Sequence, residues 1–181
     1  MISAGWNIIG GFTGYNSFGH GVFFGIGAYT TALVVNFFGM HLLAIPLSGL
    51  VAAMFAVVTG YPCLRLRGIY FSLSTVPVNY IMMLLVILLP FTGGPEGIML
   101  KPLFNFDPLT NGIILYELHV IATLATIIFT YKILHSKIGI GLISIREDEV
   151  TAVTYGVPVT KLKLLAYAMS AIPAAISGGL Y

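Results

Sequence analysis

A glycine-rich stretch near the N-terminus places polar side chains inside an otherwise apolar sequence. Residues 11–29 read GFTGYNSFGHGVFFGIGAY. Each glycine in a helix interior costs about 1 kcal/mol relative to alanine, and transporters use interrupted helices to offer free backbone groups to a substrate. We expect a helix break beside a translocation pathway, and close helix packing through small residues is the alternative. The candidate pathway residues are Gly11, Thr13, Gly14, Asn16, Ser17 and His20.

A second stretch, residues 139–163, concentrates charge in the sequence GIGLISIREDEVTAVTYGVPVTKLK. Four charged residues follow one another from Arg146 to Glu149, and successive helical residues step by about 100°, so their charges would surround one helix. Such a helix suits a polar protein surface, whereas a solvated loop between two spans is the alternative. We expect a flexible start at its first glycines and a sharp end at Gly156 and Pro158. The candidate coupling residues are Gly139, Gly141, Arg146, Glu147, Glu149 and Gly156.

Other kinds of chemistry have few candidate residues in this sequence. An intramembrane hydrolase could draw on Ser17 and His20, but no oxyanion donor or second base accompanies them. An ion- or proton-coupled secondary transporter needs an ionisable residue deep in a span, and Glu117 is the available one, near the start of its expected helix. Cys63 is the single cysteine, which excludes an intrachain disulfide and a thiolate metal cluster. We expect no enzyme activity, no metal and no cofactor.

The composition indicates that lipid surrounds most of the chain. Of 181 residues, 58% are hydrophobic and 8% are charged, against about 25% charged in soluble domains. No charged residue occurs between Met1 and Leu64, and a stretch of this kind is solvated by lipid rather than by water. The net charge of +2 is too small to suggest a nucleic-acid partner. The chain therefore reads as an all-α polytopic membrane protein.

Several apolar windows are long enough to cross about 30 Å of hydrocarbon as helices. Residues 42–64, 69–91 and 113–134 are such windows, and residues 164–181 look like the beginning of a further span. The first 38 residues are also apolar but are interrupted by glycines. The alternating polarity of barrel strands is absent from these windows. We interpret residues 1–181 as a single incomplete transmembrane domain that contains a cytoplasmic segment, residues 135–163.

The distribution of basic residues predicts how the domain is oriented. Arg65 and Arg67 lie between two windows, and further lysines and Arg146 cluster between residues 132 and 163. Basic residues favour the cytoplasmic side, and two spans separate these groups, so both are expected to face the cytoplasm. The loop 92–112, with Glu96, Lys101 and Asp107, is then external.

Four segments in order resemble the branched-chain amino-acid permease family of ABC importers, in its LivM-type subunit. Residues 11–29 resemble the family's G-T-G-x-x-S-x-G-H segment, although Tyr15 and Asn16 replace a pair that is commonly small or amide-bearing. LRLRGIYFSLST (64–75) resembles L-R-L-R-G-x-Y, and FTGGPEGI (91–98) is similar to T-G-G-x-x-G-I. Residues 136–171 resemble the cytoplasmic segment that ends in G-x-x-V-x-x-x-K-L-x-A-F.

The resemblance implies a translocation subunit that performs no bond chemistry. Residues 139–156 would dock on an ATPase, and residues 11–20 would lie along the pathway. It implies two ATP-binding subunits, a homologous second permease subunit and an extracytoplasmic substrate-binding protein, in a bacterial or archaeal plasma (inner) membrane. Leucine, isoleucine and valine are the implied substrates, with other amino acids or urea as the alternatives. Complete members of the family have further spans before Met1 and after Tyr181.

Overall fold

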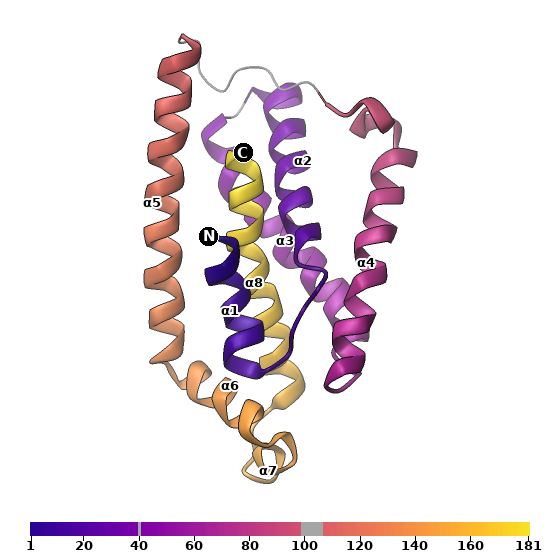
Figure 1. The fold of residues 1–181 in the computed structure, drawn as a ribbon, viewed down its shortest axis with the longest axis vertical. Helices are drawn as coiled ribbons and strands as arrows, with labels where there is room; N and C mark the ends of the chain where they lie inside the picture. The colour runs from indigo at the N-terminus through magenta and orange to yellow at the C-terminus, as the bar shows by residue number, and fades with distance from the viewer. Residues whose placement is uncertain (40, 99–106) are drawn as a thin grey trace.

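The structure is a computed structural model that describes residues 1–39, 41–98 and 107–181 (Figure 1). Its elements are α1 (Ile2–Thr13), α2 (Gly21–Phe38), α3 (His41–Cys63), α4 (Ile69–Leu88), η1 (Pro90–Thr92), η2 (Gly94–Glu96), α5 (Pro108–Leu134), α6 (Lys137–Glu147), α7 (Glu149–Thr154) and α8 (Val159–Leu180). No strand occurs within these described ranges, so the all-α prediction is confirmed. Among the described residues, five helices (α2, α3, α4, α5 and α8) are long and apolar enough to span a membrane.

The helix bounds correct the expected windows in two places. The helix expected from residue 113 starts at Pro108, where the fixed φ of proline suits the first turn. The helix expected from residue 164 starts at Val159, and its 22 residues make a full span rather than the beginning of one. The second correction brings two charged side chains, Lys161 and Lys163, into the spanning helix.

Helix α8 lies at the centre of the bundle, with α1, α2 and α3 packed around it (Figure 1). Its buried face consists largely of alanine, serine and glycine. A Cβ added at Gly27 of α2 would lie 1.9 Å from the carbonyl oxygen of Ala175, and one added at Gly178 would lie 2.0 Å from that of Phe24. The backbones of α2 and α8 are therefore in direct contact, as small residues allow in membrane helices.

Helices α4 and α5 stand at the two sides of the bundle (Figure 1). Only 17% of the spanning window of α4 and 6% of that of α5 are buried. Their exposed large side chains include Tyr80 and Leu88 on α4 and Ile121 and Ile128 on α5. The rest of the described chain leaves these apolar faces largely uncovered, so lipid or other membrane helices must cover them.

We predict that Gly27→Ala destabilises the protein whereas Gly25→Ala does not. At residue 27 the added methyl group meets the backbone of α8, and overpacking of this kind typically costs about 1–3 kcal/mol. At residue 25, on the same helix, nothing lies within 4 Å of the added Cβ, so only the better helix propensity of alanine is felt. Thermal unfolding of the detergent-solubilised protein measures both. Equal midpoints for the two variants would contradict the α2–α8 contact.

Candidate functional site

The helix break expected near the N-terminus is present, but it starts later than expected. Helix α1 continues through Gly11 to Thr13, and Gly14 ends it with a left-handed φ of 72° while its N–H donates to the Gly10 carbonyl at 3.2 Å. Helix α2 begins only at Gly21. The broken helix is confirmed, and the segment without helical structure, residues 14–20, is called the break below. Gly11 and Thr13 belong to the helix that precedes it.

Side chains from other helices hold the backbone of the break in place. The Trp6 indole donates to the Ser17 carbonyl at 3.0 Å, and the Phe18 N–H donates to Thr75 Oγ1 at 3.0 Å. Asn79 Nδ2 donates to the Phe18 carbonyl, also at 3.0 Å. Irregular backbone is tolerated at membrane depth when the protein satisfies it in this way. These bonds use backbone groups that the sequence interpretation had left free for substrate.

The polar side chains of the break have different surroundings. Asn16 is exposed, whereas Ser17 and His20 are buried. The His20 Nε2 lies 3.1 Å from the Ser170 carbonyl. In the described part of the chain no hydrogen bond joins Ser17 to His20. The geometry therefore offers no serine–histidine nucleophile, and His20 serves as a bridge between the break and α8.

A groove lies beside the break, between α2 and α4. Its volume is about 490 Å³. It is lined mainly by apolar groups, with Asn79 and Tyr29 as polar contributors, and it extends to Gly94 and Pro95 of η2. The lining residues are Gly21, Val22, Gly25, Ile26, Tyr29, Asn79, Met82, Met83, Val86, Ile87, Gly94 and Pro95. Because Asn79 also holds the Phe18 carbonyl, one end of the groove adjoins the break.

The charged segment forms two short helices rather than one. Helix α6 ends at Glu147, and Asp148 is extended, with φ −157° and ψ 112°. The Asp148 carboxylate caps α7: it accepts the Val150 N–H at 2.9 Å and a hydrogen bond from the Thr151 hydroxyl, which together lower its pKa. The expectation that the four charges surround a single helix is therefore wrong. The helix changes direction among them.

The glycines of this segment only partly follow the expectation. A Cβ added at Gly139 would lie 2.3 Å from the Ile133 carbonyl, and one at Gly141 would lie 2.7 Å from a methyl group of Leu162. These two glycines allow α6 to pack closely against its neighbours, so the expected flexible start is wrong. Gly156 follows α7 with a φ of 80°, and the sharp end expected there is present.

The three charged coupling candidates point to different places. Arg146 Nη1 donates to the Gly11 carbonyl at 2.9 Å, in the last turn of α1. Glu147 is exposed. Glu149 turns toward the bundle, where its side chain is 20% exposed and meets Lys163 and Tyr15. The structure thus brings Arg146 and Glu149 to the two sides of Gly14 and leaves Glu147 facing outward.

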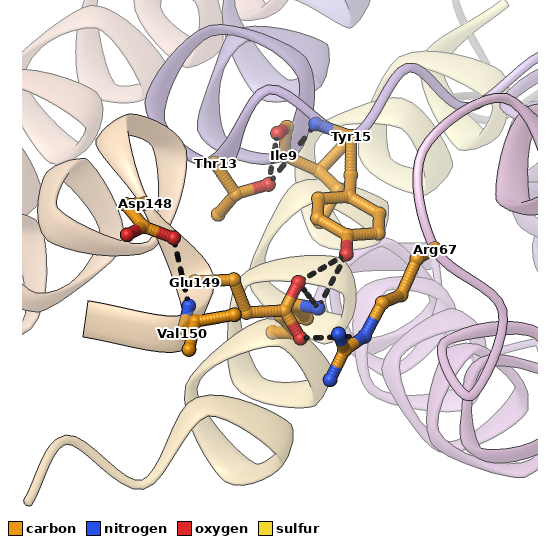
Figure 2. A network of polar contacts seen from close by, with 8 residues as sticks. Ile9, Thr13, Tyr15, Arg67, Asp148, Glu149 and Val150 are labelled. Atoms are coloured by element: carbon orange, nitrogen blue, oxygen red, sulfur yellow. Dashed lines mark hydrogen bonds and ion pairs between the residues drawn. The ribbon is translucent and has the colours of Figure 1, made fainter. Parts of the chain in front are cut away.

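Tyr15, Glu149 and Lys163 form a closed triangle of polar atoms (Figure 2). The Tyr15 hydroxyl donates to Glu149 Oε2 at 2.6 Å, Lys163 Nζ donates to the same hydroxyl at 2.6 Å, and Lys163 Nζ lies 2.7 Å from Glu149 Oε2. The Lys163 side chain is 2% exposed. Arg67, which is largely exposed, approaches the other carboxylate oxygen at 3.6 Å. The triangle joins the break, α7 and α8.

The triangle favours an ionised Glu149. Burial disfavours the carboxylate, but the hydrogen bonds from Lys163 and Tyr15 outweigh it and hold the pKa of Glu149 below its ordinary value. Burial, with the bond to the Glu149 carboxylate, raises the pKa of the Tyr15 hydroxyl above its usual range. At neutral pH the carboxylate is therefore charged and the tyrosine is protonated.

Sequence reasoning missed Tyr15 and Lys163 as functional candidates. Lys163 had been treated as one of the cytoplasmic basic residues. Helical periodicity offers a signal, because Ala166, Tyr167 and Ser170 follow Lys163 on one helix face and are buried. A lysine on such a face needs a partner, but the sequence does not indicate which residue supplies it.

With the fold and these contacts in place, the chain belongs to the family described as the permease component of the branched-chain amino acid transport system, whose model matches residues 1–181. The family is one of transport permeases rather than enzymes, and the prediction of a polytopic membrane protein is confirmed.

Two curated relatives carry the same printed name, "High-affinity branched-chain amino acid transport system permease protein LivM". The one from Salmonella typhimurium (strain LT2) is 30% identical, and the one from Escherichia coli (strain K12) is 29% identical. Each alignment covers all of this chain and 49% of the relative, so the chain spans about half the length of the relatives it matches. No solved structure matches at a significant level.

We predict that Lys163→Met lowers the free energy of unfolding far more than Lys161→Met. Removing the buried ammonium leaves the Glu149 carboxylate without its main partner, and breaking a buried pair costs roughly 3 kcal/mol. Lys161 lies two residues away on the same helix and is exposed, so its loss is expected to be nearly neutral. Denaturation of the assembled permease in detergent compares them. Similar losses for both variants would contradict the role of the triangle.

Proposed function

We propose that this permease is the translocation subunit of an ATP-driven importer of branched-chain amino acids. The family description and the names of both relatives support transport of this substrate class. The observation that supports ATP coupling is the position of α6 and α7, which lie beyond one end of the bundle, between two spanning helices (Figure 1). A force applied to this pair would reach α5 and α8 directly.

The outer surface of α7 supports contact with another protein. Val150 is 63% exposed, Val153 is 56% exposed and Tyr155, directly after the helix, is 84% exposed. Exposed apolar and aromatic side chains of this kind form the centres of protein interfaces, and charged groups surround them. We assign the ATPase contact to these three residues together with Glu147. Arg146 and Glu149, which were expected at that contact, act instead on the chain's own break.

The groove between α2 and α4 is the proposed translocation pathway. Its apolar lining suits an aliphatic side chain, and its open side would be closed by the homologous second permease subunit. The break at its end would change conformation at a lower cost than a continuous helix, because the segment 14–20 is not helical. Two ATP-binding subunits would drive alternating access from one end, and an extracytoplasmic binding protein would deliver substrate at the other.

A proton-coupled transporter is the second candidate, because Glu117 lies deeper than expected. Since α5 begins at Pro108, Glu117 is about 14 Å along the helix from its start. An ionisable residue at membrane depth is a site for proton coupling. Uptake that requires a proton gradient and is abolished by Glu117→Gln would favour this second candidate. Competition by urea would in turn indicate the other substrate class.

The orientation can be proposed from the positions of the charges. Arg67 contacts Glu149, so the α3–α4 connection and α7 lie at one end of the bundle, while η1 and η2 lie at the other (Figure 1). Basic residues favour the cytoplasm, so α6 and α7 would be cytoplasmic in a bacterial or archaeal plasma membrane. Lys101, which was expected on the external side, lies outside the described residues.

We predict that cysteine at residue 96 is labelled from outside intact cells, whereas cysteine at residue 137 is labelled only after permeabilisation. Glu96 of η2 and Lys137 of α6 are both exposed, and these two elements lie at opposite ends of the bundle (Figure 1). The substitutions Glu96→Cys and Lys137→Cys are made with Cys63 replaced by serine, and a membrane-impermeant maleimide is used. The reverse labelling pattern would invert the proposed orientation.

We predict that Val150→Asp combined with Val153→Asp releases the ATPase subunits. Charges placed on the proposed contact face lose their apolar partners, so co-purified ATPase is expected to fall by about tenfold. The matched control is Leu109→Asp, a substitution of an apolar residue that is 84% exposed at the opposite end, which is expected to retain the ATPase. Leucine uptake into proteoliposomes with internal ATP, and without a proton gradient, is measured in parallel. Retention of the ATPase by the double variant would contradict the assigned contact.

A further inference from the structure

The junction between α6 and α7 holds the break from both sides of Gly14. Before Gly14, the Arg146 guanidinium binds the Gly11 carbonyl at 2.9 Å. After Gly14, the Glu149 carboxylate accepts the Tyr15 hydroxyl at 2.6 Å (Figure 2). Arg146 and Glu149 are separated by Glu147 and Asp148 alone, the two residues at which α6 ends and α7 begins.

We propose that Arg146 and Glu149 are positioning residues that form a latch, through which displacement of α6–α7 moves the break. This inference rests on the proposed function, because it assumes that a partner displaces α7. It adds the route by which that displacement reaches the groove: α7 to Tyr15, and from Tyr15 to Phe18, whose carbonyl is held by Asn79 of the groove lining.

Because Lys163 is buried, we expect the triangle of Tyr15, Glu149 and Lys163 to move as a unit. Its ammonium is 2% exposed and is held by Glu149 Oε2 at 2.7 Å and by the Tyr15 hydroxyl at 2.6 Å. If α7 moved away alone, a buried charge would be left without its anion, and this is the most unfavourable arrangement of the three groups. Displacement of α7 is therefore cheapest when Tyr15 and the start of α8 move with it.

The chain on either side of the latch can accommodate such a movement. Gly14 has a φ of 72° and Gly156 a φ of 80°, so the chain makes a left-handed turn at the end of α1 and another after α7. Between Gly14 and Gly21 the backbone is not helical. The triangle holds its three groups together, whereas the break and the connection from α7 to α8 are not helical. A displacement of the triangle would therefore be passed on to the break.

Arg67 is not part of the latch, although it approaches Glu149. Its side chain is 70% exposed, and its nitrogen lies 3.6 Å from the carboxylate oxygen. Exposed ion pairs with such spacing contribute little. Arg67→Gln is therefore expected to leave coupling unchanged, which makes it a control for nonspecific loss of charge near Glu149.

The test measures leucine uptake and ATP hydrolysis together in proteoliposomes that contain the complete assembled transporter. Tyr15→Phe removes the hydroxyl that binds Glu149 and keeps the ring. Arg146→Gln removes the hydrogen bond from the exposed guanidinium to the Gly11 carbonyl. We expect uptake per ATP hydrolysed to fall by about tenfold in each variant, while the ATPase still co-purifies. Tyr61→Phe is the matched control, because Tyr61 is exposed and its hydroxyl accepts a hydrogen bond from Arg65 at 2.9 Å.

A second readout follows the movement itself. Spin labels at Asn16 and Thr154, both exposed, report the distance between the break and α7. With the latch intact, this distance is expected to stay constant when nucleotide is added, and in Tyr15→Phe and Arg146→Gln it is expected to change or broaden.

The outcomes separate the latch from the proposed function. Unchanged uptake per ATP in both variants would overturn the latch, and so would loss of the ATPase from the Tyr15→Phe complex, which would show that the triangle only maintains the docking surface. If the wild-type complex shows no ATP-dependent uptake, the proposed function fails. In that case the latch is tested by the distances between the spin labels at residues 16 and 154, measured without nucleotide. Identical distance distributions in wild type and both variants would overturn the latch.

Discussion

The ammonium group of Lys163 imposes the strictest demand on packing at the α6–α7 end of this molecule. It lies at the start of a spanning helix, on the face that α1, α2 and α3 cover, where water cannot solvate it. A charge in that position is tolerated only with an anion and further hydrogen bonds. Glu149 and Tyr15 supply both, from the short helix α7 and from the break. One buried charge therefore ties together three segments that are far apart in the sequence.

The small residues of α8 explain why such a demand arises in this helix. Contact between the backbones of α2 and α8 at Gly27 and Gly178 requires that face to carry little side-chain volume. The same face continues toward the start of the helix, where Tyr167 and Lys163 occupy it. The close packing of α8 in the middle of the bundle therefore also buries Lys163 near the start of the same helix. The polar triangle stabilises this buried charge.

Much of the fold follows from the sequence, because lipid imposes simple requirements. Charge-free windows predicted the positions of α3 and α4 closely. The density of glycines predicted the break, because each glycine would destabilise a continuous helix. The site was less predictable. The run from Arg146 to Glu149 looks uniform in sequence, and only the extended backbone of Asp148 sends Arg146 to α1 and Glu149 to α8. Tyr15 and Lys163 are 148 positions apart, so no local pattern could have paired them.

The distribution of packing indicates where this permease can move. Helices α2, α3 and α8 share close backbone or side-chain contacts, and rearranging them would expose polar groups or create voids. Helix α4 is held mainly at its first half, where Thr75 and Asn79 bind the break, and its outer half is largely exposed. A shift of the break would thus change the support of α4 and the width of the groove between α2 and α4 without disturbing the central helices. Because the break is also the segment that α6 and α7 hold, a displacement of these two helices would reach the groove through the break.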